Sequence, residues 1–159
     1  MVPTMAIDIV AQVEKTPNTW NLASVDKGIC AGALLPVELM KKIVAEPLGI
    51  SGMIICYGMT ETGPVSFSSK RFDEFDRLCS SIGTVMPYVE SKVVSKEGRT
   101  LKIGEFGEVF TRGFGTMLGY WNDKTKTEEL IDDNKWVQTG DIGVMDDEGF
   151  VEIIGRKKD

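Results

Sequence analysis

The polar residues best placed for chemistry follow an apolar run of strand length, Met53-Ile54-Ile55-Cys56-Tyr57. This run leads directly into Gly58-Met59-Thr60-Glu61-Thr62-Gly63. Binding sites in α/β sheets lie at such strand ends. The Tyr57 ring can stack on a purine, the Thr60 hydroxyl and backbone N–H groups can hold a phosphate oxygen, and Glu61 can bind Mg²⁺. A strand end followed by an ordinary polar turn explains the same residues equally well.

A second polar group, Thr139-Gly140-Asp141, follows the apolar segment Trp136-Val137-Gln138. One carboxylate can accept hydrogen bonds from both hydroxyls of a ribose diol, as it does in dinucleotide-binding folds. Arg156 comes at the far end of the next expected hairpin, so its guanidinium returns to the edge that holds Asp141 and can donate to ribose or phosphate oxygens. Taken singly, these features are also explained by an ordinary turn and a surface arginine.

Composition excludes several other classes of site. The 159-residue chain carries a formal net charge of -6, which argues against binding to nucleic acid or to anionic lipid. It contains no histidine, and therefore no Ser-His-Asp triad, Cys-His pair or histidine-ligated zinc. Gly113 to Gly119 does not fit the spacing of a Rossmann fingerprint, and no segment matches the phosphate loop of P-loop enzymes. The three cysteines are expected to be reduced, buried thiols of an intracellular protein, and no segment is long enough and apolar enough to span a membrane.

The first half of the chain alternates between helix and strand patterns. Thr4 is expected to cap an apolar helix that carries Ile7, Val10 and Val13, and a strand is expected over residues 28–33. Pro36 opens a second helix, which ends before the strand at residues 53–57. This order predicts parallel strands covered by helices.

After about Ser80 the pattern changes to short strands separated by glycine-containing turns. Hairpins are expected between residues 89–95 and 100–103 and between residues 142–145 and 150–154, and one helix over residues 124–131 with Asn122 or Asp123 as its cap. The second half is therefore predicted to form an antiparallel sheet or a small barrel. We divide the chain into an α/β segment at residues 1–76, a β-barrel-like lobe at residues 77–155 and a hinge at residues 156–159.

Six short motifs, taken in order, resemble the adenylate-forming (AMP-binding) superfamily, which contains acyl-CoA synthetases, luciferases and peptide-synthetase adenylation domains. They extend over nearly the whole chain: Gly32-Ala33-Leu34-Leu35-Pro36, Tyr57-Gly58-Met59-Thr60-Glu61, Gly107-Glu108-Val109, Gly119-Tyr120-Trp121, Thr139-Gly140-Asp141 and Gly155-Arg156-Lys157-Lys158-Asp159. Gly63-Pro64-Val65-Ser66-Phe67 and Met117-Leu118 resemble the fatty acyl-CoA synthetase branch, nearest to the group called acyl-CoA synthetase family member 2.

The resemblance implies the C-terminal part of the large lobe of such an enzyme, a helix-covered sheet followed by a distorted β-barrel. It implies an activity in which a fatty acid, with a medium-chain acid expected, reacts with ATP to give an acyl-adenylate and then acyl-CoA. Roles carried over by position place adenine beside Gly32, Ala33, Leu34, Tyr57, Gly58 and Met59, the α-phosphate at Thr60, Mg²⁺ at Glu61, ribose at Asp141 and Arg156, and a hinge at Lys158. The implied cofactors and co-substrates are ATP or AMP, Mg²⁺ and coenzyme A.

The resemblance also implies that the chain is a segment of a longer enzyme. The family's loop for the β- and γ-phosphates and its lysine-bearing C-terminal lobe are not in this sequence, so the 159 residues alone are expected to form no acyl-CoA. Two alternatives stay open: a non-catalytic paralogue that binds AMP or acyl-adenylate, and an enzyme that activates aryl or amino acids. The expected compartment is intracellular, with the mitochondrial matrix suggested by the resemblance.

Overall fold

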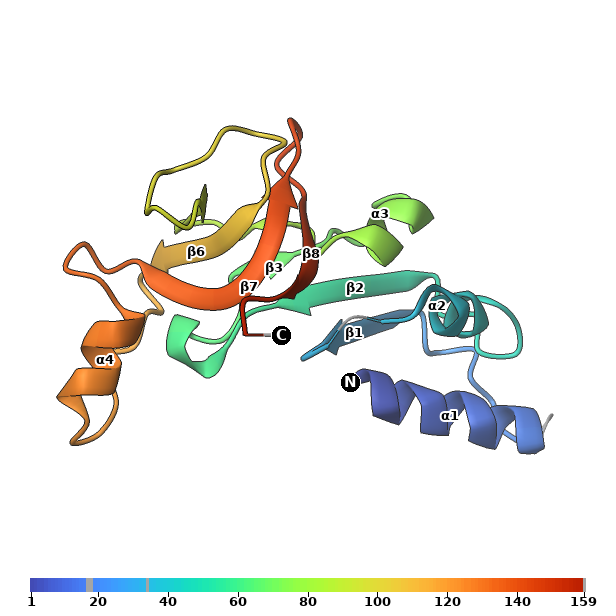
Figure 1. Cartoon of the computed structure of the whole chain (residues 1–159). Coiled ribbons are helices and arrows are strands. Elements are labelled where there is room, and N and C mark those ends of the chain that lie inside the picture. The colour runs from blue at the N-terminus through green and yellow to red at the C-terminus, as the bar shows by residue number, and fades with distance from the viewer. Residues whose placement is uncertain (17–18, 34, 159) are drawn as a thin grey trace.

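The computed structural model describes residues 1–16, 19–33 and 35–158. The chain forms two four-stranded sheets, one for each half of the sequence (Figure 1). Helices α1 and α2 lie beside the first sheet, and α4 projects from the far end of the second. The N-terminus and the end of β8 both lie near the middle of the molecule, where the two halves meet.

The first sheet has the order β1-β2-β3-β4 and begins as the sequence predicts. Strands β1 and β2 are parallel, with Lys27 paired to Gly52 and Ala31 to Cys56, and α2 connects them. β3 then pairs antiparallel with β2, and β4 pairs antiparallel with β3, so this sheet continues to Val85. Its elements are α1 (Pro3–Lys15), β1 (Lys27–Ala31), α2 (Val37–Val44), β2 (Gly52–Tyr57), η1 (Thr60–Thr62), β3 (Phe67–Ser68), α3 (Phe75–Ser80) and β4 (Thr84–Val85).

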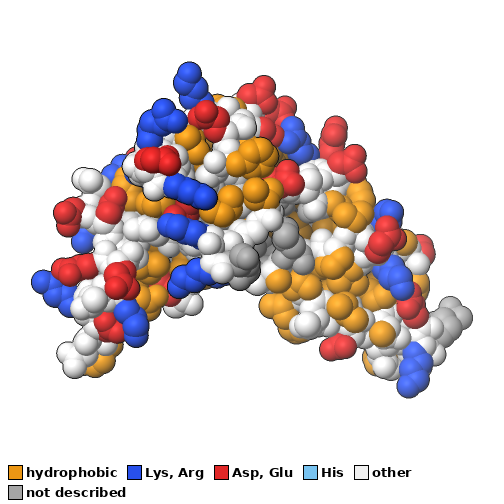
Figure 2. All heavy atoms as spheres, in the orientation of Figure 1, with side chains coloured by type: hydrophobic (Ala, Val, Ile, Leu, Met, Phe, Trp, Pro, Cys, Tyr) orange, Lys and Arg blue, Asp and Glu red, His pale blue; other side chains and the backbone are white. Residues whose placement is uncertain are grey.

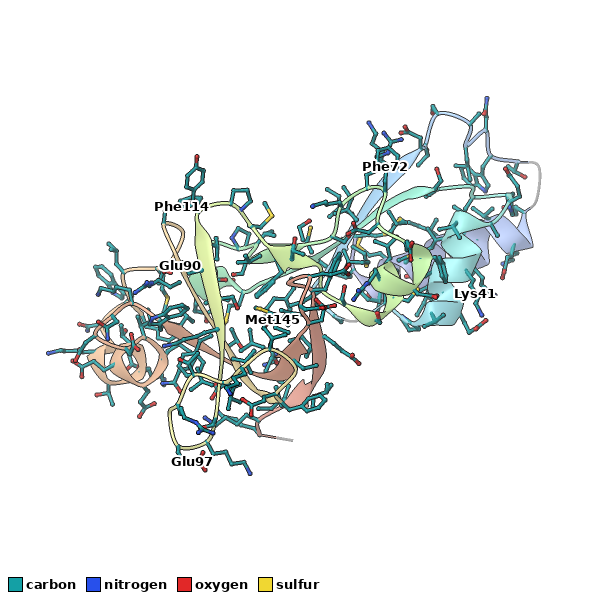
Figure 3. The ribbon with its side chains drawn as sticks, turned by 90° about the horizontal axis from the view of Figure 1, so that it is seen from above. Lys41, Phe72, Glu90, Glu97, Phe114 and Met145 are labelled. Atoms are coloured by element: carbon teal, nitrogen blue, oxygen red, sulfur yellow. The ribbon has the colours of Figure 1, made fainter. Side chains whose placement is uncertain are left out.

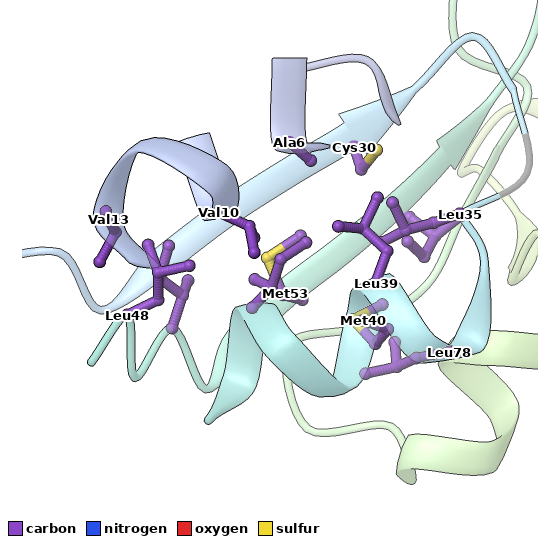
Figure 4. Packing of buried hydrophobic residues seen from close by; sticks show 13 residues of the cluster. Ala6, Val10, Val13, Cys30, Leu35, Leu39, Met40, Leu48, Met53 and Leu78 are labelled. Carbon is purple, nitrogen blue, oxygen red and sulfur yellow. The ribbon is translucent and has the colours of Figure 1, made fainter. Parts of the chain in front are cut away.

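Apolar spacing explains why these helices pack on the sheet. Leu39, Met40 and Ile43 lie on one face of α2 and are buried with Met53 of β2. Val10 of α1 reaches the same core, in which Met40 and Met53 are completely enclosed (Figure 4). The side chains of α1 and α2 therefore hold β1 and β2 from one side and fix where the carboxyl ends of these strands lie.

The first helix begins earlier than predicted. Pro3 occupies its first position and Val2 its N-cap, so the expectation that Thr4 caps the helix is wrong. Proline suits the first position because its missing N–H would have no helical partner there. The shift also changes which residues are buried: Ala6 lies in the core with Val10 and Val13, whereas Ile7 is 51% exposed. The expected end at Thr16 agrees with the cap found there, while Pro17 and Asn18 lie outside the described residues.

The second sheet is antiparallel throughout, with the order β5-β6-β7-β8. The predicted hairpin between residues 142–145 and 150–154 is confirmed as β7 and β8. Residues 100–103 form only part of the predicted hairpin with β5. They make a bridge at Thr100 and a bond from the Leu101 N–H to the Val93 carbonyl at 2.8 Å but no strand, and β6 pairs along β5 instead. The elements are β5 (Val89–Val94), β6 (Gly107–Gly113), α4 (Lys124–Leu130), β7 (Val137–Met145) and β8 (Val151–Arg156).

The two sheets are joined where β4 approaches β8. The Val151 N–H donates to the Gly83 carbonyl at 3.1 Å, and the Ile82 N–H donates to the Val151 carbonyl at 2.8 Å. Arg77 of α3 adds ion pairs to Asp146 and Glu148 in the β7–β8 turn. Seen from above, Lys41 and Phe72 lie on the first half and Glu90 and Glu97 on the second, with Met145 between them (Figure 3). These contacts place the end of β2 beside the middle of β7.

Asp123 is the cap of α4, one of the two residues predicted for that role. Its carboxylate accepts a hydrogen bond from the Lys126 N–H at 3.0 Å and pairs with the Lys126 ammonium. These bonds hold the pKa of Asp123 below its ordinary value of 3.8. A lowered folded-state pKa stabilises the fold above the unfolded value, and this contribution is lost as the pH falls through the folded value.

We therefore expect Asp123→Ala to lower the free energy of unfolding slightly at neutral pH. The difference from wild type should shrink progressively below about pH 4, as the carboxyl takes up its proton. Urea unfolding across this pH range measures it, with the exposed turn residue in Asp133→Ala as the control. A difference that stays constant into acid would contradict the cap as its cause.

Further sequence expectations concern cysteines and membrane spans. All three cysteines are free thiols, as predicted, although only Cys30 is fully buried and Cys56 and Cys79 are half-buried. Over the described ranges, none of the helices has the length and apolar character needed to cross a bilayer.

Candidate functional site

The alternating pattern of β7 places Asp141 on the buried face of its sheet. Val137, Thr139, Asp141 and Gly143 all point inward, as the period of two along a strand requires. The Thr139 hydroxyl donates to the Val109 carbonyl at 2.7 Å and accepts from the Asp141 N–H at 3.2 Å. The Thr139 side chain thus holds the backbone of Asp141 and is itself bound to β6.

Tyr57, Asp141 and Arg156 come together from three different strands. The Tyr57 hydroxyl, at the end of β2, donates to Asp141 Oδ2 at 2.5 Å. Arg156 is the β8 partner of Asp141 in the register of the hairpin, and its Nε lies 3.0 Å from Asp141 Oδ1. The prediction that Asp141 and Arg156 return to the same edge is confirmed. Contact between Asp141 and the Tyr57 hydroxyl was not predicted, because the tyrosine was considered only for its ring.

The environment keeps the Tyr57 hydroxyl protonated. Burial, reinforced by the hydrogen bond to the Asp141 carboxylate, raises the pKa of the Tyr57 hydroxyl above its ordinary value. The phenol therefore remains a donor at neutral pH. Phe67 packs against the Tyr57 ring in a T-shaped arrangement with centroids 5.8 Å apart, which fixes the orientation of the ring. The Asp141 side chain is only 8% exposed, whereas that of Arg156 is 68% exposed.

The proposed adenine-flanking residues lie at one edge of the first sheet. Since Ala31 pairs with Cys56 in parallel register, Gly32 and Ala33 leave β1 where Tyr57 ends β2. Gly32 has φ +88°, a conformation that favours glycine, and both it and Ala33 are exposed. Leu34 lies outside the described residues. The carboxyl ends of two adjacent parallel strands therefore bring Gly32, Ala33 and Tyr57 to the same edge of the sheet.

Glu61 lies in the single turn of 3₁₀ helix, η1, that follows β2. The Thr62 hydroxyl accepts from the Met59 N–H and donates to the Met59 carbonyl, which fixes this turn locally. The Glu61 carboxylate accepts a hydrogen bond from the Tyr120 hydroxyl at 2.6 Å. This bond, followed by partial burial, raises the pKa of Tyr120. Thr60, the first residue of this turn, is exposed.

The residues around Glu61 fit a magnesium ion held together with a nucleotide. Among the described residues, no group of three or more acidic or thiol side chains is assembled into an all-protein metal site. Mg²⁺ in nucleotide enzymes needs only one or two carboxylates, because phosphate oxygens and water complete its coordination. The Tyr120 hydroxyl binds one oxygen of Glu61, Oε1, and leaves Oε2 available.

A groove of about 610 Å³ lies between α4, β7 and the end of β8. Figure 2 shows basic side chains gathered over β7 and β8 on this face, and Arg156, Lys157 and Lys158 line the groove. Lys157 pairs with the buried Glu108 at 2.7 Å, and its N–H donates to the Gly140 carbonyl at 2.8 Å. Lys158, the predicted hinge residue, is exposed and follows this fixed point directly.

Sequence reasoning missed two interactions of the site. Glu108 was noted only as part of a motif, yet its carboxylate accepts from the Gly140 N–H at 3.1 Å and holds the turn before Asp141. Tyr120 was likewise noted only as a motif residue. The available signal was that Glu108 and Tyr120 are polar residues within mostly apolar motifs. Their partners could not be identified from the sequence, because they lie 32 and 59 residues away along the chain.

Comparison with known sequences agrees with the motifs. Residues 1–121 match the family model described as AMP-binding enzyme. Over 99% of its length the chain is 38% identical to the mitochondrial medium-chain acyl-CoA ligase ACSF2 of Bos taurus and 40% identical to that of Danio rerio. It is 36% identical to the acyl-CoA ligase sidI of Aspergillus fumigatus. The chain spans about a quarter of the length of these relatives.

Solved structures of similar fold include CoA ligases. A long-chain-fatty-acid-CoA ligase from Archaeoglobus fulgidus superposes with a TM-score of 0.86 at 27% identity, over 98% of this chain and 33% of that one. The anthranilate CoA ligase AuaEII in complex with anthranoyl-AMP gives 0.87 at 28% identity, over 100% of this chain and 29% of that one. The predicted fold class, a helix-covered sheet segment followed by the β-rich part of a large lobe, is confirmed. Sequence, fold and family model agree that this chain belongs to the AMP-binding enzyme family.

Proposed function

We propose that this chain forms the AMP-binding wall of a fatty acyl-CoA ligase whose substrate is a medium-chain acid. The observation that carries the proposal is the meeting of Tyr57, Asp141 and Arg156 at the seam between the two sheets. An aromatic ring, a carboxylate and a guanidinium are the groups that recognise a base, a ribose diol and a phosphate. Relatives named medium-chain acyl-CoA ligases and a neighbour solved with an acyl-adenylate support the same function.

In this proposal the nucleoside lies along the seam. Adenine packs between the Tyr57 ring and the backbone of residues 32–34, with Gly58 and Met59 at its edge. Asp141 accepts hydrogen bonds from the ribose hydroxyls, and it has the capacity to do so. A carboxylate offers about four lone-pair positions, of which Tyr57 and Arg156 use two. Arg156 then binds ribose or phosphate oxygens with the nitrogens that Asp141 leaves free.

The reacting groups lie beyond the ribose, at η1. The Thr60 hydroxyl donates to the α-phosphate, and Glu61 holds Mg²⁺, which when bound neutralises phosphate charge as the fatty acid carboxylate displaces pyrophosphate. The acyl group then passes from AMP to the thiol of coenzyme A. Lys158 serves as the hinge about which the enzyme rearranges between these two half-reactions.

The remaining parts of the proposal concern context. The phosphate-binding loop and the moving lobe are supplied by the rest of the enzyme, since the relatives are about four times as long. The bovine and zebrafish ligases are named mitochondrial, and we extend this compartment to the present protein.

An exchange assay tests the function. The complete reading frame that encodes this chain, supplied with ATP and Mg²⁺, is expected to exchange labelled pyrophosphate into ATP only when a fatty acid is present, most rapidly with medium-chain acids. Long-chain fatty acids, anthranilate, benzoate and amino acids form the comparison series. Exchange supported by aryl or amino acids alone would assign a different substrate class, and AMP binding without any exchange would indicate a non-catalytic paralogue.

A further inference from the structure

Within the part of the chain that the structure describes, the carboxylate of Glu61 has a single hydrogen-bond donor, and it comes from a distant position in the sequence. Tyr120 lies 59 residues later, and its hydroxyl donates to Glu61 Oε1 at 2.6 Å. Within the described residues, no lysine or arginine lies within ion-pair distance of this carboxylate. The phenol is therefore the group that sets the orientation of Glu61 in the described structure.

Tyr120 is itself held in place by the segment around it. Its N–H donates to the Thr127 hydroxyl at 2.9 Å, and that hydroxyl donates in turn to the Asp123 carbonyl at 2.8 Å. Gly119 packs so closely that a Cβ there would meet the Thr127 side chain at 2.9 Å. Tyr120 is 38% exposed, but its backbone is fixed against the start of α4, and its hydroxyl is a defined donor.

The segment that carries Tyr120 is also joined to η1 through the backbone. The Met117 N–H donates to the Glu61 carbonyl at 2.9 Å, so Glu61 is held at both its backbone and its side chain. Beside it, a Cβ on Gly63 would lie 2.4 Å from the Gly115 carbonyl oxygen, which shows that the two backbones are in direct contact. Residues 115–120 and η1 therefore form one connected unit, although β3, α3, β4, β5 and β6 lie between them along the chain.

We propose that Tyr120 is a positioning residue for Glu61, holding Oε1 by its hydroxyl so that Oε2 is presented to a divalent cation bound with the nucleotide. The inference rests on the function proposed above, in which Glu61 holds Mg²⁺. A glutamate side chain has several rotatable bonds, and fixing one oxygen removes most of the freedom that metal binding would otherwise have to restrict. Hydrogen-bond partners of ligating carboxylates orient the ligand, and their loss commonly weakens metal affinity by about 10–100-fold.

The variant Tyr120→Phe removes the donor and keeps the ring. In the protein from the complete reading frame, we expect the Kd for Mn²⁺ in the presence of AMP, measured by electron paramagnetic resonance, to rise by about tenfold or more. The affinity for AMP without metal should not change. In the exchange assay, the Mg²⁺ concentration for half-maximal rate should rise in parallel, and saturating Mg²⁺ should restore kcat. Tyr88→Phe is the matched control, because Tyr88 is 90% exposed and its hydroxyl has no partner among the described residues.

Glu61→Gln separates a failure of this inference from a failure of the proposed function. If Glu61→Gln weakens Mn²⁺ binding and Tyr120→Phe leaves it unchanged, Glu61 is the ligand and the positioning role is refuted. If Glu61→Gln itself leaves Mn²⁺ affinity unchanged, the metal role of Glu61 is wrong and the positioning role falls with it. A Tyr120→Phe protein that loses stability and kcat, with no recovery at high Mg²⁺, would show a purely structural hydrogen bond.

Discussion

Replacing Asp141 with alanine is expected to weaken AMP binding by about 100-fold or more, because each hydrogen bond to a charged acceptor contributes about 1.5–3 kcal/mol and the ribose diol makes two. The loss extends beyond the ligand. Tyr57 would keep its hydroxyl in a half-buried position without the acceptor it now has at 2.5 Å. Calorimetry of AMP binding to the protein from the complete reading frame measures the effect, with Asp147→Ala, in the exposed turn of the same hairpin, as the control.

Deoxy analogues test whether the ribose is the group that Asp141 recognises. Wild type should bind AMP far more tightly than 2′,3′-dideoxy-AMP, whereas Asp141→Ala should bind the two with nearly equal affinity. Tyr57→Phe is expected to lie between them, since it keeps the ring for adenine and the carboxylate for ribose but loses the donor that orients the carboxylate. If Asp141→Ala retained the full preference for AMP, the ribose assignment would have to be abandoned.

Replacing Gly58 with alanine is expected to lower the free energy of unfolding by about 3 kcal/mol or more, the upper range for overpacking at a rigid contact. A Cβ at this position would lie 2.0 Å from the Pro64 carbonyl oxygen and 3.0 Å from the Ser66 nitrogen. Both atoms belong to backbone that is fixed by the bond from the Ser66 N–H to the Tyr57 carbonyl at 2.8 Å. The chain leaving β2 would have to move, and Tyr57 and η1 would move with it.

Urea unfolding of the 159-residue chain measures this change. Gly155→Ala is the matched control, because it places a Cβ on a strand glycine with no atom within 4 Å. It should change the free energy of unfolding by no more than about 1 kcal/mol. Equal stability of the two variants would mean that the backbone around Gly58 can relax, and that the close approach does not require glycine.

Both predictions have their largest effects at the seam between the sheets, for the same physical reason. Tyr57 belongs to the first sheet and Asp141 to the second, so the hydrogen bond between them is made only when both halves are in place. The two halves are also held together by the hydrogen bonds that Ile82 and Gly83, just before β4, make with Val151 of β8. The proposed nucleotide site is therefore also a place where the two sheets hold each other.

Local order in the first half of the chain could be predicted because local rules govern it. The apolar run before Gly58 specified β2, Pro36 and the spacing of Leu39 and Ile43 specified α2, and their alternation with β1 specified parallel pairing. The predicted start of the first helix is wrong. Thr4 was expected to be the N-cap, but the helix already begins at Pro3 and its N-cap is Val2. Helix ends depend on single residues, whereas the helix itself depends on a repeated pattern.

Strand partners in the second half were harder to predict. The chain does turn back between residues 95 and 100 as predicted, but β5 pairs along its length with β6. Its contact with residues 100–103 is limited to a bridge at Thr100 and a hydrogen bond from Leu101 to Val93. Prediction from turn residues assigns each strand to the next segment along the chain, which for β5 is residues 100–103. The extended pairing with β6 brings Phe110 and Val109 opposite β5, and residue spacing along the sequence does not reveal such side-chain packing.

The sequence by itself determined α2, β2, the β7–β8 hairpin, the family and the residue types of the site, because periodicity, turn residues and short motifs are local properties of a chain. It also placed Asp141 and Arg156 together, since one hairpin joins them. Only the tertiary structure decided that the Tyr57 hydroxyl binds Asp141, that Tyr120 holds Glu61 and that Glu108 is paired with Lys157. Each of these contacts joins residues that are 49 to 84 positions apart along the chain. Their geometry therefore depends on how whole elements pack.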